Sequence, residues 1–175
     1  MDIFIIETVS ANNINKEMLL KYKMKTISNS RKLREHCLSY LMTDKILENV
    51  YKISDRKISF KNNKPFLESD DKFLSISHSK DYIALGFSDY ECGIDIEKMT
   101  DRDFKKISER MNFDFISKED FYKKWTLYEA KYKLGTEPSA EKSYFYKDYC
   151  ITACSSYTNE TFELYIQSIN NFSKA

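Results

Sequence analysis

The sequence predicts an α+β protein, because short apolar segments with strand-like alternation are interspersed with segments whose apolar residues recur every three or four positions. The order strand, helices, strands occurs twice along the chain, although we find no repeat in the sequence itself. This order indicates two similar α/β subdomains that divide near residues 89–91. We therefore expect an N-terminal subdomain of residues 1–89 and a C-terminal subdomain of residues 90–175.

The N-terminal half begins with a β-branched, apolar segment at 3–9 that predicts a strand. A helix is expected over 14–24. A longer one should run from 28 to about 51, since serine and asparagine at its start are favoured N-caps. Three more strands and two polar turns are expected after it: strands at 57–60, 73–77 and 82–88, and turns at 61–65 and 78–81.

The C-terminal half repeats this order with a strand at 92–97 and a helix at 101–110. A second helix should begin at Ser117, which forms a capping-box pattern with Asp120, and end at Gly135. Its expected apolar stripe consists of Phe121, Trp125, Tyr128 and Tyr132. Two strands, at 143–153 and 161–169, should close the sheet.

The composition argues against several classes of protein. The 28 Lys and Arg residues nearly balance 27 Asp and Glu residues, so the net charge of +1 gives no reason to expect a nucleic-acid partner. No segment approaches the roughly 20 apolar residues of a membrane span. With 3 glycines the chain has no glycine-rich phosphate loop, and its 4 cysteines form no zinc motif. Reduced cysteines favour a cytoplasmic protein.

Two acidic residues share one face of the strand predicted at 92–97. Side chains alternate along a strand, so Asp95 and Glu97 point the same way, roughly 7 Å apart, while Ile94 and Ile96 point into the core. Such a pair can converge on a hard cation. The alternative is the solvated acidic face of an edge strand.

Glu129 and Lys133 lie four residues apart, on one face of the helix that begins at Ser117. They could form an ordinary surface ion pair, which contributes about 0.3–0.5 kcal/mol. Trp125, one turn before Glu129, places the carboxylate beside the expected apolar stripe and shields it partly from water. A shielded carboxylate is a better metal ligand than a freely moving one.

A third motif is the polar segment 75–79, Ser-Ile-Ser-His-Ser. Ser77 and His78 are adjacent on a strand and point to opposite faces, so they cannot pair as a nucleophile and its base. They can bind an anion from a polar turn, or His78 can be a structural residue at a strand end. Arg31 and Lys64 are further basic residues that could bind an anion or belong to the ordinary charged surface.

Taken in order, these motifs resemble those of the 4′-phosphopantetheinyl transferase superfamily. An Asn-Lys-Pro turn at 63–65 and the segment 75–79 are followed by Gly-Ile-Asp-Ile-Glu at 93–97 and Trp-x-x-x-Glu-Ala-x-x-Lys at 125–133. The larger, pseudo-dimeric branch, which activates peptide and polyketide synthases, is the more similar one. The resemblance implies that the two subdomains pack as an intramolecular pseudo-dimer.

The resemblance also implies a role for each motif residue. Asp95, Glu97 and Glu129 would hold Mg²⁺, or Mn²⁺, together with the pyrophosphate of coenzyme A, the co-substrate. Glu129 would act as base towards the incoming serine, and Lys133 would stabilise charge on the leaving phosphate. Four residues would contact the phosphates of coenzyme A: Arg31, Lys64, Ser77 and His78.

The implied reaction transfers 4′-phosphopantetheine to a serine of an acyl or peptidyl carrier protein and releases 3′,5′-ADP. A duplicated architecture would let a monomer complete its own cleft. The chain has Tyr128 where the family commonly has Lys, and Asn63 where it commonly has Gly. Tyr128 favours a second hypothesis, a module that binds coenzyme A or a carrier without turnover. A third, an interaction-only protein, requires all the motifs to be surface features.

Overall fold

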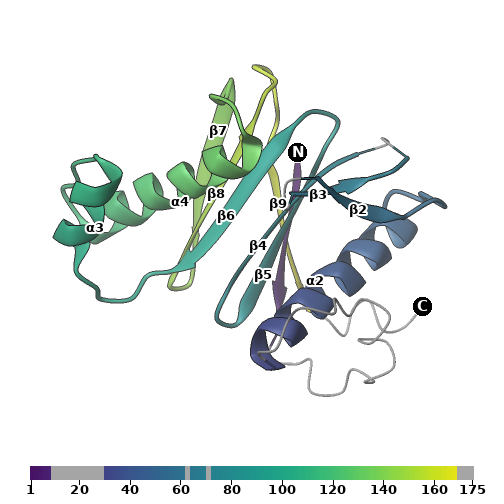
Figure 1. Ribbon diagram of the computed structural model, residues 1–175, viewed down its shortest axis with the longest axis horizontal. Helices are drawn as coiled ribbons and strands as arrows, with labels where there is room; N and C mark the ends of the chain where they lie inside the picture. The colour runs from purple at the N-terminus through teal and green to yellow at the C-terminus, as the bar shows by residue number, and fades with distance from the viewer. Residues whose placement is uncertain (9–29, 62–63, 70–71, 169–175) are drawn as a thin grey trace.

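The computed structural model describes residues 1–8, 30–61, 64–69 and 72–168, and it is a mixed α+β fold (Figure 1). The helix expected at 14–24 lies outside the described residues. Among the helices that the structure describes, none has the length and apolar character needed to cross a membrane.

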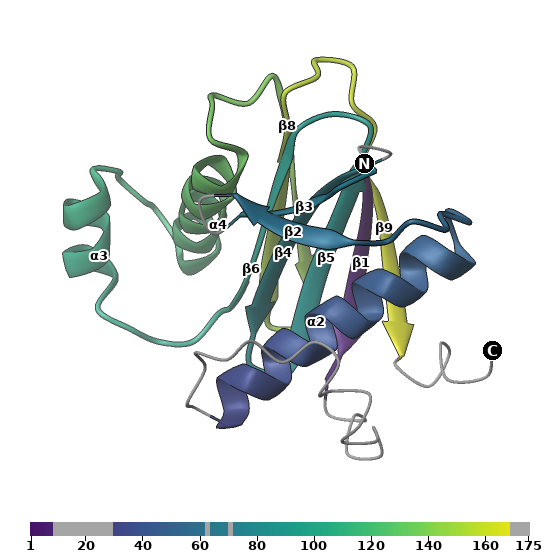
Figure 2. The ribbon, with the colours of Figure 1, turned by 45° about the vertical axis from the view of Figure 1, so that its right-hand side comes forward.

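The first sheet has the strand order β4-β5-β1-β9. It is antiparallel except that β9 runs parallel to β1. Helix α2 (Ser30–Asn49) crosses one face of this sheet (Figure 2) and packs its apolar residues in the core beneath it. The strands are β1 (Asp2–Glu7), β4 (Phe73–Ser79), β5 (Tyr82–Ser88) and β9 (Glu163–Ser168).

The second sheet is antiparallel, with the order β6-β8-β7. Helix α4 (Lys118–Leu134) packs on β6 and β8, and helix α3 (Phe104–Met111) lies farther out. The strands are β6 (Cys92–Lys98), β7 (Ala140–Tyr146) and β8 (Tyr149–Ser155).

One apolar cluster joins the two sheets. Ile3 and Ile5 of β1 pack in the same cluster as Ile94 and Ile96 of β6 and Ile151 of β8. Because side chains alternate along a strand, burying both isoleucines of β6 in this core turns Asp95 and Glu97 to the opposite face. This confirms the orientation that the sequence predicts for the two carboxylates.

Two segments differ from the sequence prediction. The segment predicted as a turn at 61–65 contributes strand β3 (Lys64–Leu67), which pairs with β2 (Ile58–Lys61). Pro65 is tolerated there because a strand of a two-stranded sheet has a free edge, where no N–H donor is needed. The single strand predicted at 143–153 is in fact the hairpin of β7 and β8.

The hairpins β4-β5 and β7-β8 share a short sequence that the sequence analysis missed. Each turns on a Lys-Asp pair followed by Tyr, and Lys80 and Lys147 both adopt a left-handed φ of 52°. Each hairpin also pairs through its second strand with a third strand, so β4-β5-β1 and β7-β8-β6 have the same order. A match of three residues is too short to stand out from the sequence alone.

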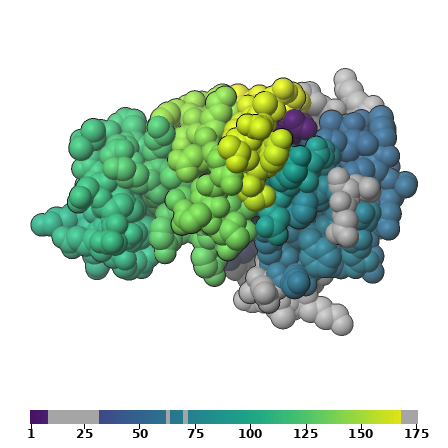
Figure 3. Space-filling model, turned by 90° about the horizontal axis from the view of Figure 1, so that it is seen from above, coloured from purple at the N-terminus to yellow at the C-terminus, as the bar shows by residue number. Residues whose placement is uncertain are grey.

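The predicted division near residues 89–91 stays a prediction, and one strand crosses it. Strand β9 belongs to the C-terminal half of the sequence but pairs with β1 in the sheet of the N-terminal half. In Figure 3 the segment leading to β9, coloured yellow, lies between the green and blue parts of the molecule.

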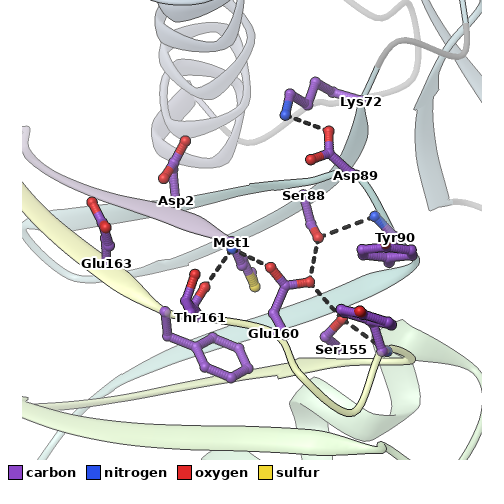
Figure 4. A network of polar contacts seen from close by, with 12 residues as sticks. Met1, Asp2, Lys72, Ser88, Asp89, Tyr90, Ser155, Glu160, Thr161 and Glu163 are labelled. Atoms are coloured by element: carbon purple, nitrogen blue, oxygen red, sulfur yellow. Dashed lines mark hydrogen bonds and ion pairs between the residues drawn. The ribbon is translucent and has the colours of Figure 1, made fainter.

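A polar network at the ends of β5 and β8 also ties the sheets together (Figure 4). The amino group of Met1 donates to a carboxylate oxygen of Glu160 and to the carbonyl of Thr161, the latter at 2.5 Å. The other carboxylate oxygen of Glu160 accepts from Ser88 at 2.7 Å and from Ser155 at 2.8 Å. Because Ser88 ends β5 and Ser155 ends β8, Glu160 bridges the two sheets.

Candidate functional site

The site forms where helix α4 lies unusually close to strand β6. A Cβ atom added to Gly93 would be 2.0 Å from the backbone oxygen of Ala130. No side chain fits in that space, so a glycine in the strand allows the helix to approach it. This close approach brings Glu129 and Lys133, on either side of Ala130, to the acidic face of β6.

Both ends of α4 are as predicted. Ser117 caps the helix by accepting a hydrogen bond from the backbone N–H of Asp120 at 3.1 Å, and Gly135 ends it with a φ of 88°.

The predicted apolar stripe is wrong in its second half. Tyr128 and Tyr132 are 48% and 81% exposed, because the close contact at Gly93 requires the small residue Ala130 to face the sheet. The face that is buried consists of Phe121, Tyr122, Thr126, Ala130 and Leu134.

Asp95 is the most constrained acidic residue of the site and is only 6% exposed. Its Oδ1 atom accepts hydrogen bonds from Ser77 Oγ at 2.7 Å and from Lys133 Nζ at 2.8 Å. Lys133 also donates to the carbonyl of Ile94 at 2.9 Å. The Oδ2 atom is buried without a hydrogen-bond partner among the described residues. An unpaired buried oxygen is costly, so this atom is a natural ligand for a cation.

Glu97 and Glu129 lie in the electrostatic field of Asp95. Burial raises the pKa of the Glu97 carboxyl, and the negative charge of Asp95 raises it further. The same two causes raise the pKa of Glu129, against the opposing effect of Lys133. Three carboxylates that repel one another favour a bound cation, and carboxylate oxygens suit Mg²⁺ or Mn²⁺.

The residues therefore fit a hard cation by their chemistry and by the free Oδ2 atom. In the described part of the chain, however, no three His, Cys, Asp or Glu side chains form a group that could hold an ion.

Three serines of β4 connect it to β6. The hydroxyls of Ser75, Ser77 and Ser79 accept hydrogen bonds from the backbone N–H groups of Ile94, Ile96 and Lys98, at 3.0, 3.4 and 3.1 Å. Side-chain oxygens thus take the place of the backbone carbonyls that would join two strands of one sheet.

Two of these hydroxyls also bind the carboxylates, since Ser77 donates to Asp95 and Ser79 donates to Glu97 Oε2 at 3.2 Å. Ser77 was predicted as a site residue but Ser75 and Ser79 were not, although serines at alternate positions on a strand are a readable signal. The predicted contact of Ser77 with a phosphate stays a prediction, and its hydroxyl is committed to Asp95.

Of the predicted phosphate-binding residues whose side chains the structure describes, Lys64, Ser77 and His78 each contact a different partner. His78 points away from Asp95, and its Nδ1 atom is 3.7 Å from Glu35 Oε2. Lys64 donates to the carbonyl of Leu134, at the end of α4, at 3.4 Å. The side chain of Arg31 lies outside what the structure describes.

One cation of the site was missed by the sequence analysis. Arg102, between β6 and α3, stacks on Trp125 with its guanidinium carbon 4.4 Å from the ring centroid. Its Nη2 atom is 3.8 Å from Glu97 Oε2. An isolated arginine in a loop gives no sequence signal, because its partners are brought to it by the fold.

A scan against protein-family models and a search of curated proteins both find no match for this chain.

Proposed function

We propose that the chain transfers the 4′-phosphopantetheine group of coenzyme A to a serine of an apo acyl or peptidyl carrier protein and releases 3′,5′-ADP. The observation that supports this proposal is the difference in hydrogen bonding between the two carboxylate oxygens of Asp95. Its Oδ1 atom is fixed by Ser77 and Lys133, while its Oδ2 atom has no hydrogen-bond partner in the described part of the chain. A carboxylate so held can offer a single oxygen to a metal ion in a defined direction.

In the proposed reaction the serine oxygen attacks the phosphorus that carries the pantetheine group. The bond between that phosphorus and the bridging oxygen breaks, and 3′,5′-ADP leaves with that oxygen. Asp95, Glu97 and Glu129 would hold Mg²⁺, which supplies charge neutralisation at the pyrophosphate.

The protein's own residues supply the proton transfer and the second positive charge. Glu129 accepts the serine proton as general base. Lys133 donates to Asp95 at 2.8 Å and therefore adds a fixed positive charge beside the metal ligands. That charge stabilises the negative charge that develops on the leaving phosphate.

We infer that the two sheets form the intramolecular pseudo-dimer that the resemblance implies. The shared orders β4-β5-β1 and β7-β8-β6, each with one packed helix, support an intramolecular pseudo-dimer. Ser77 of one sheet and Asp95 of the other meet at the junction. The site would then be completed within one chain.

A second candidate function is binding of coenzyme A or a carrier without turnover. Tyr128 favours it, because this exposed side chain carries no charge where the resembled family commonly has a lysine. Binding would survive this change, whereas a loss of positive charge would slow the transfer step.

The deciding experiment is intact-mass analysis of candidate apo-carriers incubated with the chain, coenzyme A and Mg²⁺. We expect the carrier to gain one phosphopantetheine group with the unaltered chain and none with Asp95→Asn. Asp101→Asn is the matched control, since Asp101 is 93% exposed and pairs only with Lys118 among the described residues. Calorimetric binding of coenzyme A without any mass gain would favour the binding module. The absence of both coenzyme A binding and mass gain would overturn both functions.

A further inference from the structure

Arg102 is held in one orientation by two aromatic rings of α4. Its guanidinium carbon lies 4.4 Å from the centroid of Trp125 and 5.3 Å from that of Tyr122. The two rings are themselves parallel, with an interplanar angle of 5°. A guanidinium stacked on aromatic faces loses little further entropy when it binds a ligand.

Within the described part of the chain, most hydrogen-bond donors of Arg102 have no partner. A guanidinium has five N–H donors. Among the described residues, Arg102 makes one hydrogen bond, from Nη2 to Thr100 Oγ1 at 3.4 Å. Its separation of 3.8 Å from Glu97 Oε2 exceeds hydrogen-bond length, so this is an ion pair only. The side chain is 28% exposed, which leaves its donors open to a ligand.

Among the described residues, Arg102 is the cation whose charge acts on Glu97, whereas Lys133 and Arg110 act on Glu129. Lys133 is committed to Asp95 and to the carbonyl of Ile94. Position 128 carries a neutral Tyr side chain. A metal ion bound to Glu97 would neutralise the charge of that carboxylate and so weaken its ion pair with Arg102. The guanidinium of Arg102 would then be available to an anion bound by the same ion.

We propose that Arg102 binds a non-bridging phosphate oxygen of a pyrophosphate-containing ligand at this site, and so supplies the positive charge that Tyr128 lacks. The proposal rests on the proposed function for the identity of the ligand, coenzyme A. The planar fork of arginine matches two phosphate oxygens at once, which a lysine ammonium cannot do.

The test is calorimetric titration of the full chain with inorganic pyrophosphate and, separately, with coenzyme A, both in the presence of Mg²⁺. Arg102→Ala should weaken both affinities by roughly ten- to a hundredfold, the range for hydrogen bonds to charged groups. Arg102→Lys should recover only part of the loss, because it keeps the charge but not the fork. Lys105→Ala is the matched control, since Lys105 is 85% exposed and pairs with Glu109 alone among the described residues.

Trp125 provides a readout at the site itself, because it is the 1 tryptophan of the chain and contacts the guanidinium directly. Its fluorescence should change when pyrophosphate binds the unaltered chain. Thermal unfolding of each variant separates a lost contact from a lost fold, and Arg102→Lys keeps the test usable if Arg102→Ala unfolds.

Unchanged pyrophosphate and coenzyme A affinities in both arginine variants would overturn the role of Arg102. If carriers are still modified in that case, the proposed function stands without it. Binding of pyrophosphate that depends on Arg102, without modification of any carrier, would support the anion contact and count against the transferase. An unaltered chain that binds neither ligand would overturn both.

Discussion

The hydroxyl of Ser77 donates a 2.7 Å hydrogen bond to Oδ1 of Asp95, and this contact joins the two sheets at the proposed metal site. We predict that Ser77→Ala raises the Mg²⁺ concentration needed for transfer several-fold, because the carboxylate then keeps only Lys133 to orient it. Its unfolding free energy should fall by about 1–3 kcal/mol.

The matched control is Ser75→Ala, which removes a hydroxyl of the same row that binds no carboxylate. It should lower stability by a similar amount while the Mg²⁺ dependence of transfer stays unchanged. Equal Mg²⁺ dependence in the two variants would reduce Ser77 to a purely structural residue.

A cation that binds Asp95 should stabilise the folded chain, since it relieves the repulsion among the three carboxylates. At a Mg²⁺ concentration a hundredfold above the dissociation constant the gain is about 2.7 kcal/mol, seen as a higher melting temperature. We predict that Asp95→Asn melts at the same temperature with and without Mg²⁺, whereas Asp101→Asn behaves like the unaltered chain. An equal Mg²⁺ response in Asp95→Asn would remove this carboxylate from the ligand set.

Gly93→Ala should be among the most damaging small changes in the chain. Its Cβ would lie 2.0 Å from the backbone oxygen of Ala130, so strand and helix must separate, at a cost of about 1–3 kcal/mol or more. Transfer should fall further than stability, because the shift moves Glu129 and Lys133 away from Asp95. Urea unfolding and the initial rate of carrier modification measure the two effects.

Gly86→Ala is the control for this change. Its Cβ would lie 2.2 Å from the terminal methyl of Met1, which is the flexible end of a side chain and can move aside. If Gly86→Ala and Gly93→Ala destabilise the chain equally, the close approach of β6 and α4 is not what positions the site.

Glu160 makes stability depend on acid pH. Burial alone would raise its pKa, but hydrogen bonds from the Met1 amino group, Ser88 and Ser155 outweigh burial and lower it. A lowered folded-state pKa gives stability that is present above the unfolded value of about 4.3 and is lost as the pH falls through the folded value. Unfolding free energies measured from pH 6 downward should therefore fall less steeply in Glu160→Gln than in the unaltered chain or in Glu109→Gln.

The sequence predicted those features of the site that depend on a single strand or helix, and it failed where a distant residue decides the packing. Strand alternation correctly turned Asp95 and Glu97 away from Ile94 and Ile96, because that rule is local to the strand. Cap residues likewise predicted both ends of α4. The prediction that Tyr128 and Tyr132 are buried was wrong, because Gly93, far away in sequence, decides which face of the helix can approach the sheet.

The contacts of Ser79 and Arg102 with Glu97 could not be predicted for a related reason. Ser79 acts across the junction of β4 and β6, and Arg102 acts from the loop after β6, so both contacts exist only once the chain has folded. Sequence spacing within one element carries no information about such a junction.

The parallel pairing of β9 with β1 has a consequence for synthesis of the protein. Strand β1 obtains one of its two neighbours only after residues 163–168 have been synthesised, so the first sheet stays incomplete until then. Until then one edge of β1 is open to pairing with another nascent copy. Synthesis of residues 163–168, more than emergence of the first half, should be the event that completes the first sheet.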